Sequence, residues 1–217
     1  WGDLNNVYVP QAVTVDTAGV YVFGIVERSG GPQIQIVRKY DLRGNELWTR
    51  ELSRYYYATF AAAAPNGFYV SALEFGAGGV SLRKYSSGGD VLWTRRVGEW
   101  NDLGPYGPPD VVADVTGVYV AGGNNLTSSL PGYCRSGSGG DSFVRKYGPD
   151  GTELWARQFG TANGSSAFGV AVADTGVYVV GQTGFGRFDL FEPANATSAA
   201  FLARFEITAA PVTRTGP

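Results

Sequence analysis

One sequence unit recurs along this chain, and its recurrence limits the folds that the chain can adopt. The second half of the unit reads IVRKYDLRGNELWTRELS from Ile36, SLRKYSSGGDVLWTRRVG from Ser81 and FVRKYGPDGTELWARQFG from Phe143. The first half carries a tyrosine that recurs at intervals of 48, 50 and 59 residues. The four tyrosines are Tyr21, Tyr69, Tyr119 and Tyr178. A repeat of this length is typical of propellers and solenoids, whose units bury apolar surface against their neighbours.

Each repeat divides into four short predicted strands, a to d. In the last two repeats strand a reads VAVA (170–173), strand b GVYVVG (176–181), strand c FVRKY (143–147) and strand d ELWARQ (153–158). Strand b is rich in β-branched and aromatic residues, and short turns that end in glycine join a to b and c to d, as in β-hairpins. No segment has helical periodicity. We therefore predict an all-β chain.

The strand pattern favours a β-propeller built from four-stranded antiparallel blades. We place the blade units at about 11–52, 60–98, 110–160 and 168–207, within a propeller region 1–207 that is followed by a Pro/Thr-rich tail or linker, 208–217. The small residues of strand a fit a crowded central axis. The tryptophan of strand d, always 8 residues after the tyrosine of strand c, is expected to pack between blades.

The repeats resemble the SBBP-type β-propeller repeat of secreted and cell-surface bacterial and archaeal proteins. The resemblance rests on GVAVADTGVYVVGQT (169–183), DSFVRKYGPDGTELWARQFG (141–160) and their copies, and it covers nearly the whole chain. It implies a propeller displayed on or outside the cell, and it implies no shared ligand.

The blade count leaves two arrangements open. The fourth repeat ends after strand c (201–207), and the opening Trp-Gly-Asp aligns with the end of a strand d. A strand upstream of Trp1 would close a ring of four blades, which is the smallest propeller. Alternatively, the chain is part of a larger propeller. We favour the second arrangement. The sequence contains no methionine, not even at position 1, which indicates either a processed product or a piece of a longer chain.

Composition excludes several kinds of chemistry. There is no histidine, and the single cysteine, Cys134, forms neither an internal disulfide nor a cysteine-rich zinc site. A net charge of −2 argues against a nucleic-acid binder, and no apolar run is long enough to span a membrane. The aspartates that recur at turns are expected to cap their own backbone, and Asp189 with Glu192 makes a poor calcium site. We assign no catalytic, cofactor-binding or metal-binding residue.

All the length variation falls on the b–c and d–a connections, which share one face of an antiparallel meander. Long loops on a rigid scaffold are where binding residues usually lie. Candidate partner-binding residues there are Trp100, Tyr106, Tyr133 and Phe188. Candidate N-glycosylation sites on the same face are Asn125, Asn163 and Asn195, each in an Asn-X-Ser/Thr triplet. Alternatively, the aromatic side chains fold back over their own loops.

Strand c places Lys39, Lys84, Lys146 and Arg204 in one register. A basic ring is one interpretation. We favour the other, in which the aliphatic stems pack on neighbouring strands and the charged heads are solvated or paired.

Three functions are compatible with these observations. The leading hypothesis is a non-catalytic extracellular or cell-surface module for structure, adhesion or surface assembly as filament, sheath or layer, with protein or glycan partners and self-association through exposed blade edges. A lectin-like glycan or protein binder that uses the variable loops is the alternative. A quinone-dependent propeller enzyme is the remote alternative, because YDLRGNELW and YGPDGTELW also resemble the tryptophan-docking repeat of pyrroloquinoline-quinone enzymes.

Overall fold

The computed structural model describes residues 6–28, 31, 33–54, 56–74, 79–99, 108–124, 140–161, 164–184 and 199–207. The first sheet contains β1 (Asn6–Asp16), β2 (Gly19–Arg28), β3 (Ile34–Tyr40) and β4 (Glu46–Arg54). The second contains β5 (Tyr56–Ala64), β6 (Gly67–Glu74), β7 (Gly79–Ser86) and β8 (Val91–Glu99). The third contains β9 (Asp110–Asp114), β10 (Gly117–Asn124), β11 (Asp141–Tyr147) and β12 (Glu153–Phe159). The fourth contains β13 (Ser165–Ala173), β14 (Gly176–Thr183) and β15 (Ala199–Phe205).

Each repeat forms its own antiparallel sheet, with the strands in the order of the chain. Every described element is a strand, so the prediction of an all-β chain made of antiparallel sheets is confirmed. Three sheets have four strands, and the fourth sheet has three within the described residues. The described residues do not close into a ring or a barrel. Closure into a propeller therefore remains a prediction.

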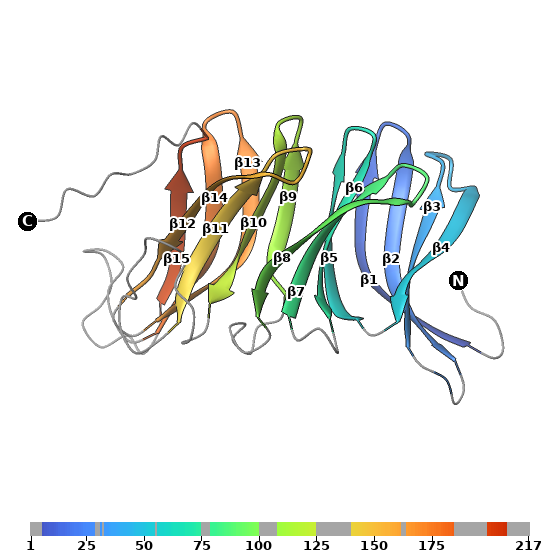
Figure 1. The fold of residues 1–217 in the computed structure, drawn as a ribbon, viewed down its shortest axis with the longest axis horizontal. Coiled ribbons are helices and arrows are strands. Elements are labelled where there is room, and N and C mark those ends of the chain that lie inside the picture. The colour runs from blue at the N-terminus through green and yellow to red at the C-terminus, as the bar shows by residue number, and fades with distance from the viewer. Residues whose placement is uncertain are drawn as a thin grey trace, which may run out of the picture.

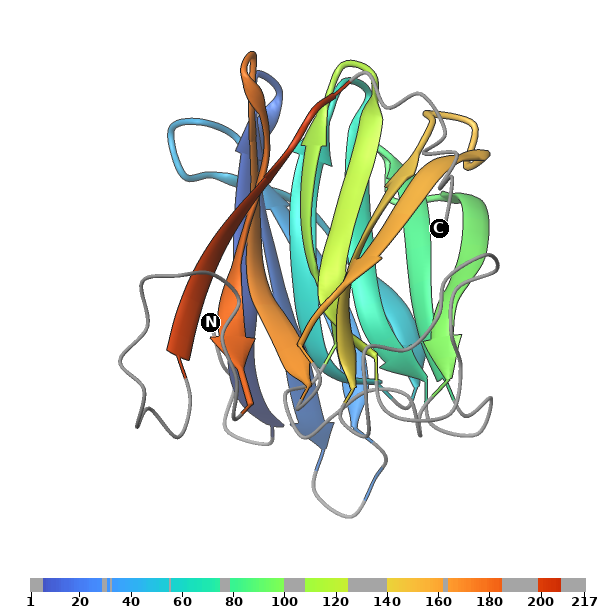
Figure 2. The same cartoon turned by 90° about the vertical axis from the view of Figure 1, so that its left-hand side faces the viewer.

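The four sheets stand in a row in the order of the sequence, with the first and the fourth at opposite ends (Figure 1). The first strands of successive sheets lie side by side, β1 beside β5, β5 beside β9 and β9 beside β13. Turned by 90°, the row is seen from the end formed by the fourth sheet, with the other sheets behind it (Figure 2).

The core is divided among the gaps between sheets. Side chains alternate between the two faces of a strand. In the two inner sheets, the second and the third, both faces carry apolar residues. We call the face of a sheet toward the next sheet its forward face and the other its backward face. Tyr21 and Phe23, on the forward face of the first sheet, pack on Phe68 and Val70 of the second. The ring centroids of Tyr21 and Phe68 are 4.9 Å apart. The same pairing of faces builds the second and third gaps.

The connections divide between the two edges of the row. The short a–b and c–d turns lie along one edge, drawn toward the top of Figure 1, and we call it the hairpin edge. The opposite edge holds the strand ends where the b–c and d–a connections begin, and we call it the loop edge. In the c–d turns, a glycine with positive φ accepts the tight bend, as at Gly44 (90°) and Gly151 (82°).

Candidate functional site

The loop edge is the candidate binding face, and the structure places the strands that support it. The strand ends that flank the connections 100–107, 125–139 and 185–198 all lie at this edge, as the antiparallel topology requires. The candidate residues themselves lie outside the described residues. They are Trp100, Tyr106, Tyr133 and Phe188, with the glycosylation candidates Asn125, Asn163 and Asn195. Cys134, Asp189 and Glu192 lie outside them as well.

A ladder of tyrosine, lysine and tryptophan crosses the forward face of each four-stranded sheet. In the first sheet Tyr21 pairs with Lys39, and Lys39 pairs with Trp48 across the next ladder. The equivalent triplets are Tyr69, Lys84 and Trp93, then Tyr119, Lys146 and Trp155. The expected common register of strand c is therefore present, and Arg204 continues it opposite Tyr178.

The lysine heads lie over tyrosine rings, and two of them are buried. The Nζ atoms of Lys39 and Lys146 lie 4.9 Å from the ring centroids of Tyr21 and Tyr119, within the range of a cation–π contact. Both lysines are buried. This arrangement fits the prediction that the stems pack on neighbouring strands and the charged heads are solvated or paired, because these two heads pair with tyrosine rings and not with water. Placement between stacked sheets, which the sequence does not show, is the physical reason.

The tryptophans of the first and second sheets receive the c–d turn of the next sheet. In the second sheet, Trp93 Nε1 and Lys84 Nζ each donate a hydrogen bond of 2.9 Å to the Pro149 carbonyl of the third. Arg95 Nε donates to the Gly151 carbonyl at 2.7 Å. A Cβ at Gly151 would lie 2.9 Å from the indole of Trp93, so only glycine fits there. The tryptophans thus pack between sheets, as predicted, and Trp93 also binds backbone.

Trp155 departs from this pattern. Its ring packs in the third gap, against a cluster that Phe205 of β15 and Ile207, just after β15, also contact. The buried Nε1 atom of Trp155 nevertheless has no hydrogen-bond acceptor. Ile207 is the equivalent of Pro149. Pro149 lies two residues after Tyr147, the last paired residue of β11, and Ile207 lies two residues after Phe205, the last paired residue of β15. This unsatisfied donor was not predictable from the repeat, because the tryptophan motif is the same in all three copies.

Aspartates cap the turns of the hairpin edge. Asp16 Oδ1 accepts from Ala18 N at 2.7 Å, and Asp150 Oδ1 accepts from Thr152 N at 2.9 Å. At Asp114, burial opposes the charged form, but hydrogen bonds from Thr116 and Tyr119 and the charge of Lys146 outweigh it, so the pKa is lowered. These carboxylates are used by the turns, as predicted.

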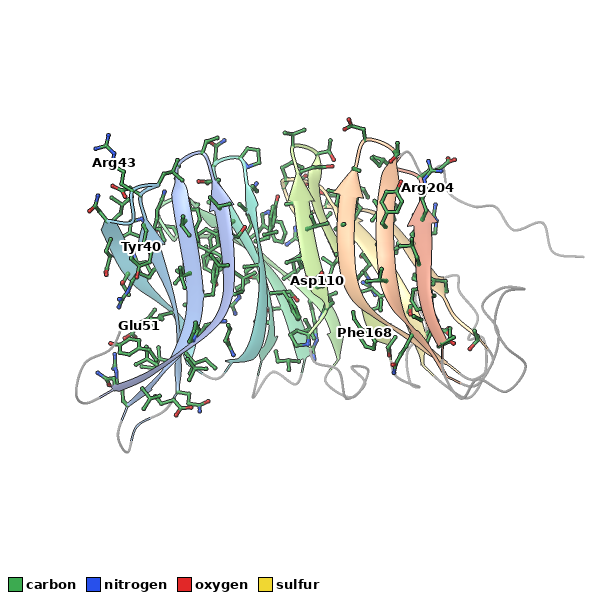
Figure 3. All side chains as sticks on the ribbon, turned by 180° about the vertical axis from the view of Figure 1, so that it is seen from behind. Tyr40, Arg43, Glu51, Asp110, Phe168 and Arg204 are labelled. Atoms are coloured by element: carbon green, nitrogen blue, oxygen red, sulfur yellow. The ribbon has the colours of Figure 1, made fainter. Side chains whose placement is uncertain are left out.

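Asp110 is a carboxylate that sequence reasoning missed. It begins β9, and its oxygens accept hydrogen bonds from its neighbour Val111 N and from Val170 N of the fourth sheet, both at 2.9 Å. Figure 3 labels it between the third and fourth sheets. Burial raises its pKa against the effect of these two bonds. Thr14 Oγ1 has the corresponding role in the first gap, accepting from Ala63 N at 2.7 Å. Both residues join first strands of adjacent sheets.

The described residues contain no group of three or more cysteine, aspartate or glutamate side chains arranged to hold a metal ion. Nothing helical in this part of the chain has the length and hydropathy of a membrane-spanning segment. The polar side chains detailed above make contacts within and between sheets.

Comparison with solved structures finds a similarity that covers nearly the whole chain. The fold is similar to part of the phage phi92 endosialidase. The match covers 95% of this chain and 37% of that one, with a TM-score of 0.52 and 12% sequence identity. At this identity the likeness concerns the fold alone. No protein-family model matches the sequence, and comparison with curated proteins finds no match.

Proposed function

We propose that this chain is a non-catalytic β-propeller module of the SBBP type, outside the cell or on its surface, that serves structure, adhesion or surface assembly. Its partners would be proteins or glycans, and it would bind no nucleic acid. Stacked four-stranded sheets whose first strands run side by side support the blade arrangement. The resemblance of the repeats supports the location.

The observation that carries the proposal is the difference between the two edges: one has short, fixed turns, and the other has connections of variable length. The hairpin edge is held by capped turns and by the tryptophan contacts of the ladder, for example Pro149 on Trp93. Strand ends at the loop edge present connections of unequal length on that fixed frame. A rigid scaffold with variable loops along one edge is typical of binding modules.

A lectin-like activity is the second candidate, favoured by the aromatic residues of these connections. Aromatic side chains bind sugar rings and dominate many protein interfaces. In this reading Trp100 and Tyr133 contact the glycan, whereas in the structural reading the sheets themselves are the functional part.

The experiment is a binding assay with the intact chain. Labelled protein is incubated with envelope fractions of the source cells and with an array of glycans, and retention is measured. We expect saturable retention on the envelope. Loss of glycan binding in Trp100→Ala and Tyr133→Ala, but not in the control Leu154→Ala at an exposed site near the hairpin edge, favours the lectin-like alternative.

The same preparation is assayed for catalysis. Dye-linked dehydrogenase activity with pyrroloquinoline quinone and calcium tests the quinone-enzyme alternative, and endosialidase activity is tested because a structural neighbour has that name. We expect neither. Turnover in either assay, or absence of any retention on the envelope, contradicts the proposal.

A further inference from the structure

We propose that the two end faces of the row bind each other between copies of this chain, the forward face of the fourth sheet in one copy against the backward face of the first sheet in the next. The inference rests on the assembly role in the proposed function and names its partner, a second copy. It follows from a position-by-position comparison of the end faces with the same faces inside the row.

The forward face of the fourth sheet exposes positions that are fully buried in every other sheet. Leu202 is 69% exposed, whereas its register equivalents Val37, Leu82 and Val144 are all at 0%. Val180, paired with Leu202, is 46% exposed. Its equivalents Phe23, Ser71 and Ala121 are at 0%. Apolar side chains thus continue across this face, where the inner sheets would have a neighbour.

The backward face of the first sheet shows the complementary pattern. Val13 and Val15 on β1 are 65% and 60% exposed. Val20, which pairs with Val15, is only half-buried, whereas its equivalents Phe68, Val118 and Val177 are fully buried by the preceding sheet. Figure 3 shows Tyr40, beside this face, and Arg204, on the forward face of the fourth sheet, at opposite ends of the row.

A hairpin turn is also without a neighbour at this end. The c–d turns of the second and third sheets dock on the preceding tryptophan, so that a Cβ at Gly89 would lie 3.4 Å from Trp48. The equivalent glycine of the first sheet, Gly44, has nothing within 4 Å of a Cβ. In the proposed contact this turn lies over Arg204, the register equivalent of Lys84, which donates to such a turn inside the row.

The three gaps between sheets indicate which molecule covers the exposed end faces. In each of them a forward face is covered by a backward face of this same sequence repeat, and the two exposed end faces are one of each kind. Because the faces differ and lie at opposite ends, the contact is heterologous and joins the copies head to tail.

The test uses three variants at exposed positions of the folded chain. Val13→Glu blocks the backward end face, Leu202→Glu blocks the forward end face, and Val115→Glu, at a 78% exposed site in the β9–β10 turn, is the control. Mass is measured by light scattering and sedimentation over a range of concentrations, with circular dichroism to verify folding. A charge buried without a partner at the contact is expected to weaken it by more than about a hundredfold.

We expect the mass of the wild type and of Val115→Glu to rise with concentration above the 23.0 kDa of one chain. Val13→Glu and Leu202→Glu should each remain a single chain. Mixed together they should form a complex of two chains and no more, because each supplies the face that the other lacks.

Other outcomes overturn the inference. If Val13→Glu alone still associates, like faces bind each other. If the wild type stays a single chain at all concentrations, something else covers the end faces, such as another sheet of a longer polypeptide. Envelope retention by a single-chain wild type would leave the proposed function standing without this contact. Loss of envelope retention with self-association intact would contradict the proposed function and leave the contact between end faces standing.

Discussion

The indole N–H groups of Trp93 and Trp155 lie in equivalent positions but have different surroundings, so the same substitution is expected to have different effects. Trp93 Nε1 donates to the Pro149 carbonyl at 2.9 Å, whereas the buried Trp155 Nε1 has no acceptor. Substitution by phenylalanine removes the N–H and a similar amount of apolar surface at both sites. The difference between the two variants therefore isolates the hydrogen bond.

The expected magnitude follows from the contacts. Trp93→Phe loses a hydrogen bond worth about 1 kcal/mol in the free energy of unfolding, while Trp155→Phe removes an unsatisfied donor that costs about 1–3 kcal/mol. Trp155→Phe should therefore be more stable than Trp93→Phe by roughly 2 kcal/mol or more. For a chain of this length each kcal/mol corresponds to about 2–4 °C, so the melting temperatures should differ by about 4–8 °C.

Differential scanning calorimetry of the two variants and the wild type measures this difference. Amide and indole hydrogen exchange on the wild type provides a second readout, in which the Trp93 indole N–H is protected by its bond. Equal melting temperatures for the two variants, or a lower one for Trp155→Phe, would refute the reasoning. Such a result would mean that the Trp155 indole has an acceptor in solution.

Two further predictions concern the turns and the buried phenols. Gly151→Ala should destabilise the protein more than Gly44→Ala, by about 1–3 kcal/mol in the free energy of unfolding, measured with heat or denaturant. Both glycines have positive φ, but only a Cβ at Gly151 meets the Trp93 ring. Equal losses of stability in the two variants would contradict the docking of the turn. Burial raises the pKa of Tyr69 and of Tyr147 to about 12, above the usual 10, so their contribution to stability is complete below pH 10 and is lost as the pH rises from 10 through 12. Tyrosinate absorbance measures the two pKa values, and unfolding at alkaline pH measures the loss of stability. Tyr69→Phe should reduce the dependence of stability on pH. Titration of every tyrosine near pH 10 would contradict this prediction.

The arrangement of strands was predictable because each repeat carries its own hairpin signals. Gly151 and its equivalents mark the c–d turns, and alternating strands such as FVRKY supply one residue to each face. The pairing of lysine with tryptophan also follows from the spacing, since 9 residues separate them in each of the three repeats. Local periodicity therefore determines the individual sheets.

What lies between sheets was not predictable from the spacing. The burial of Lys39 and Lys146, the acceptor role of Asp110 and the unsatisfied Trp155 indole depend on which residue of a neighbouring sheet approaches. Sequence equivalence hides these differences, because the same motif binds a docked turn in the second gap and has no indole acceptor in the third. Binding at the loop edge stays a prediction, since its candidate residues lie outside the described part of the chain.

The local nature of the ladders has a consequence for synthesis. Each sheet completes its backbone pairing within one continuous stretch, such as 6–54 for the first, and needs no residue from a later repeat. Because contacts that are close in sequence form early, the strands of one sheet are expected to pair before the next repeat is synthesised. The last-made sheet then shows its forward face, with tyrosine and tryptophan uncovered, and the repeat that emerges next is the one that covers it. The order of translation is thus also the order in which the gaps are packed.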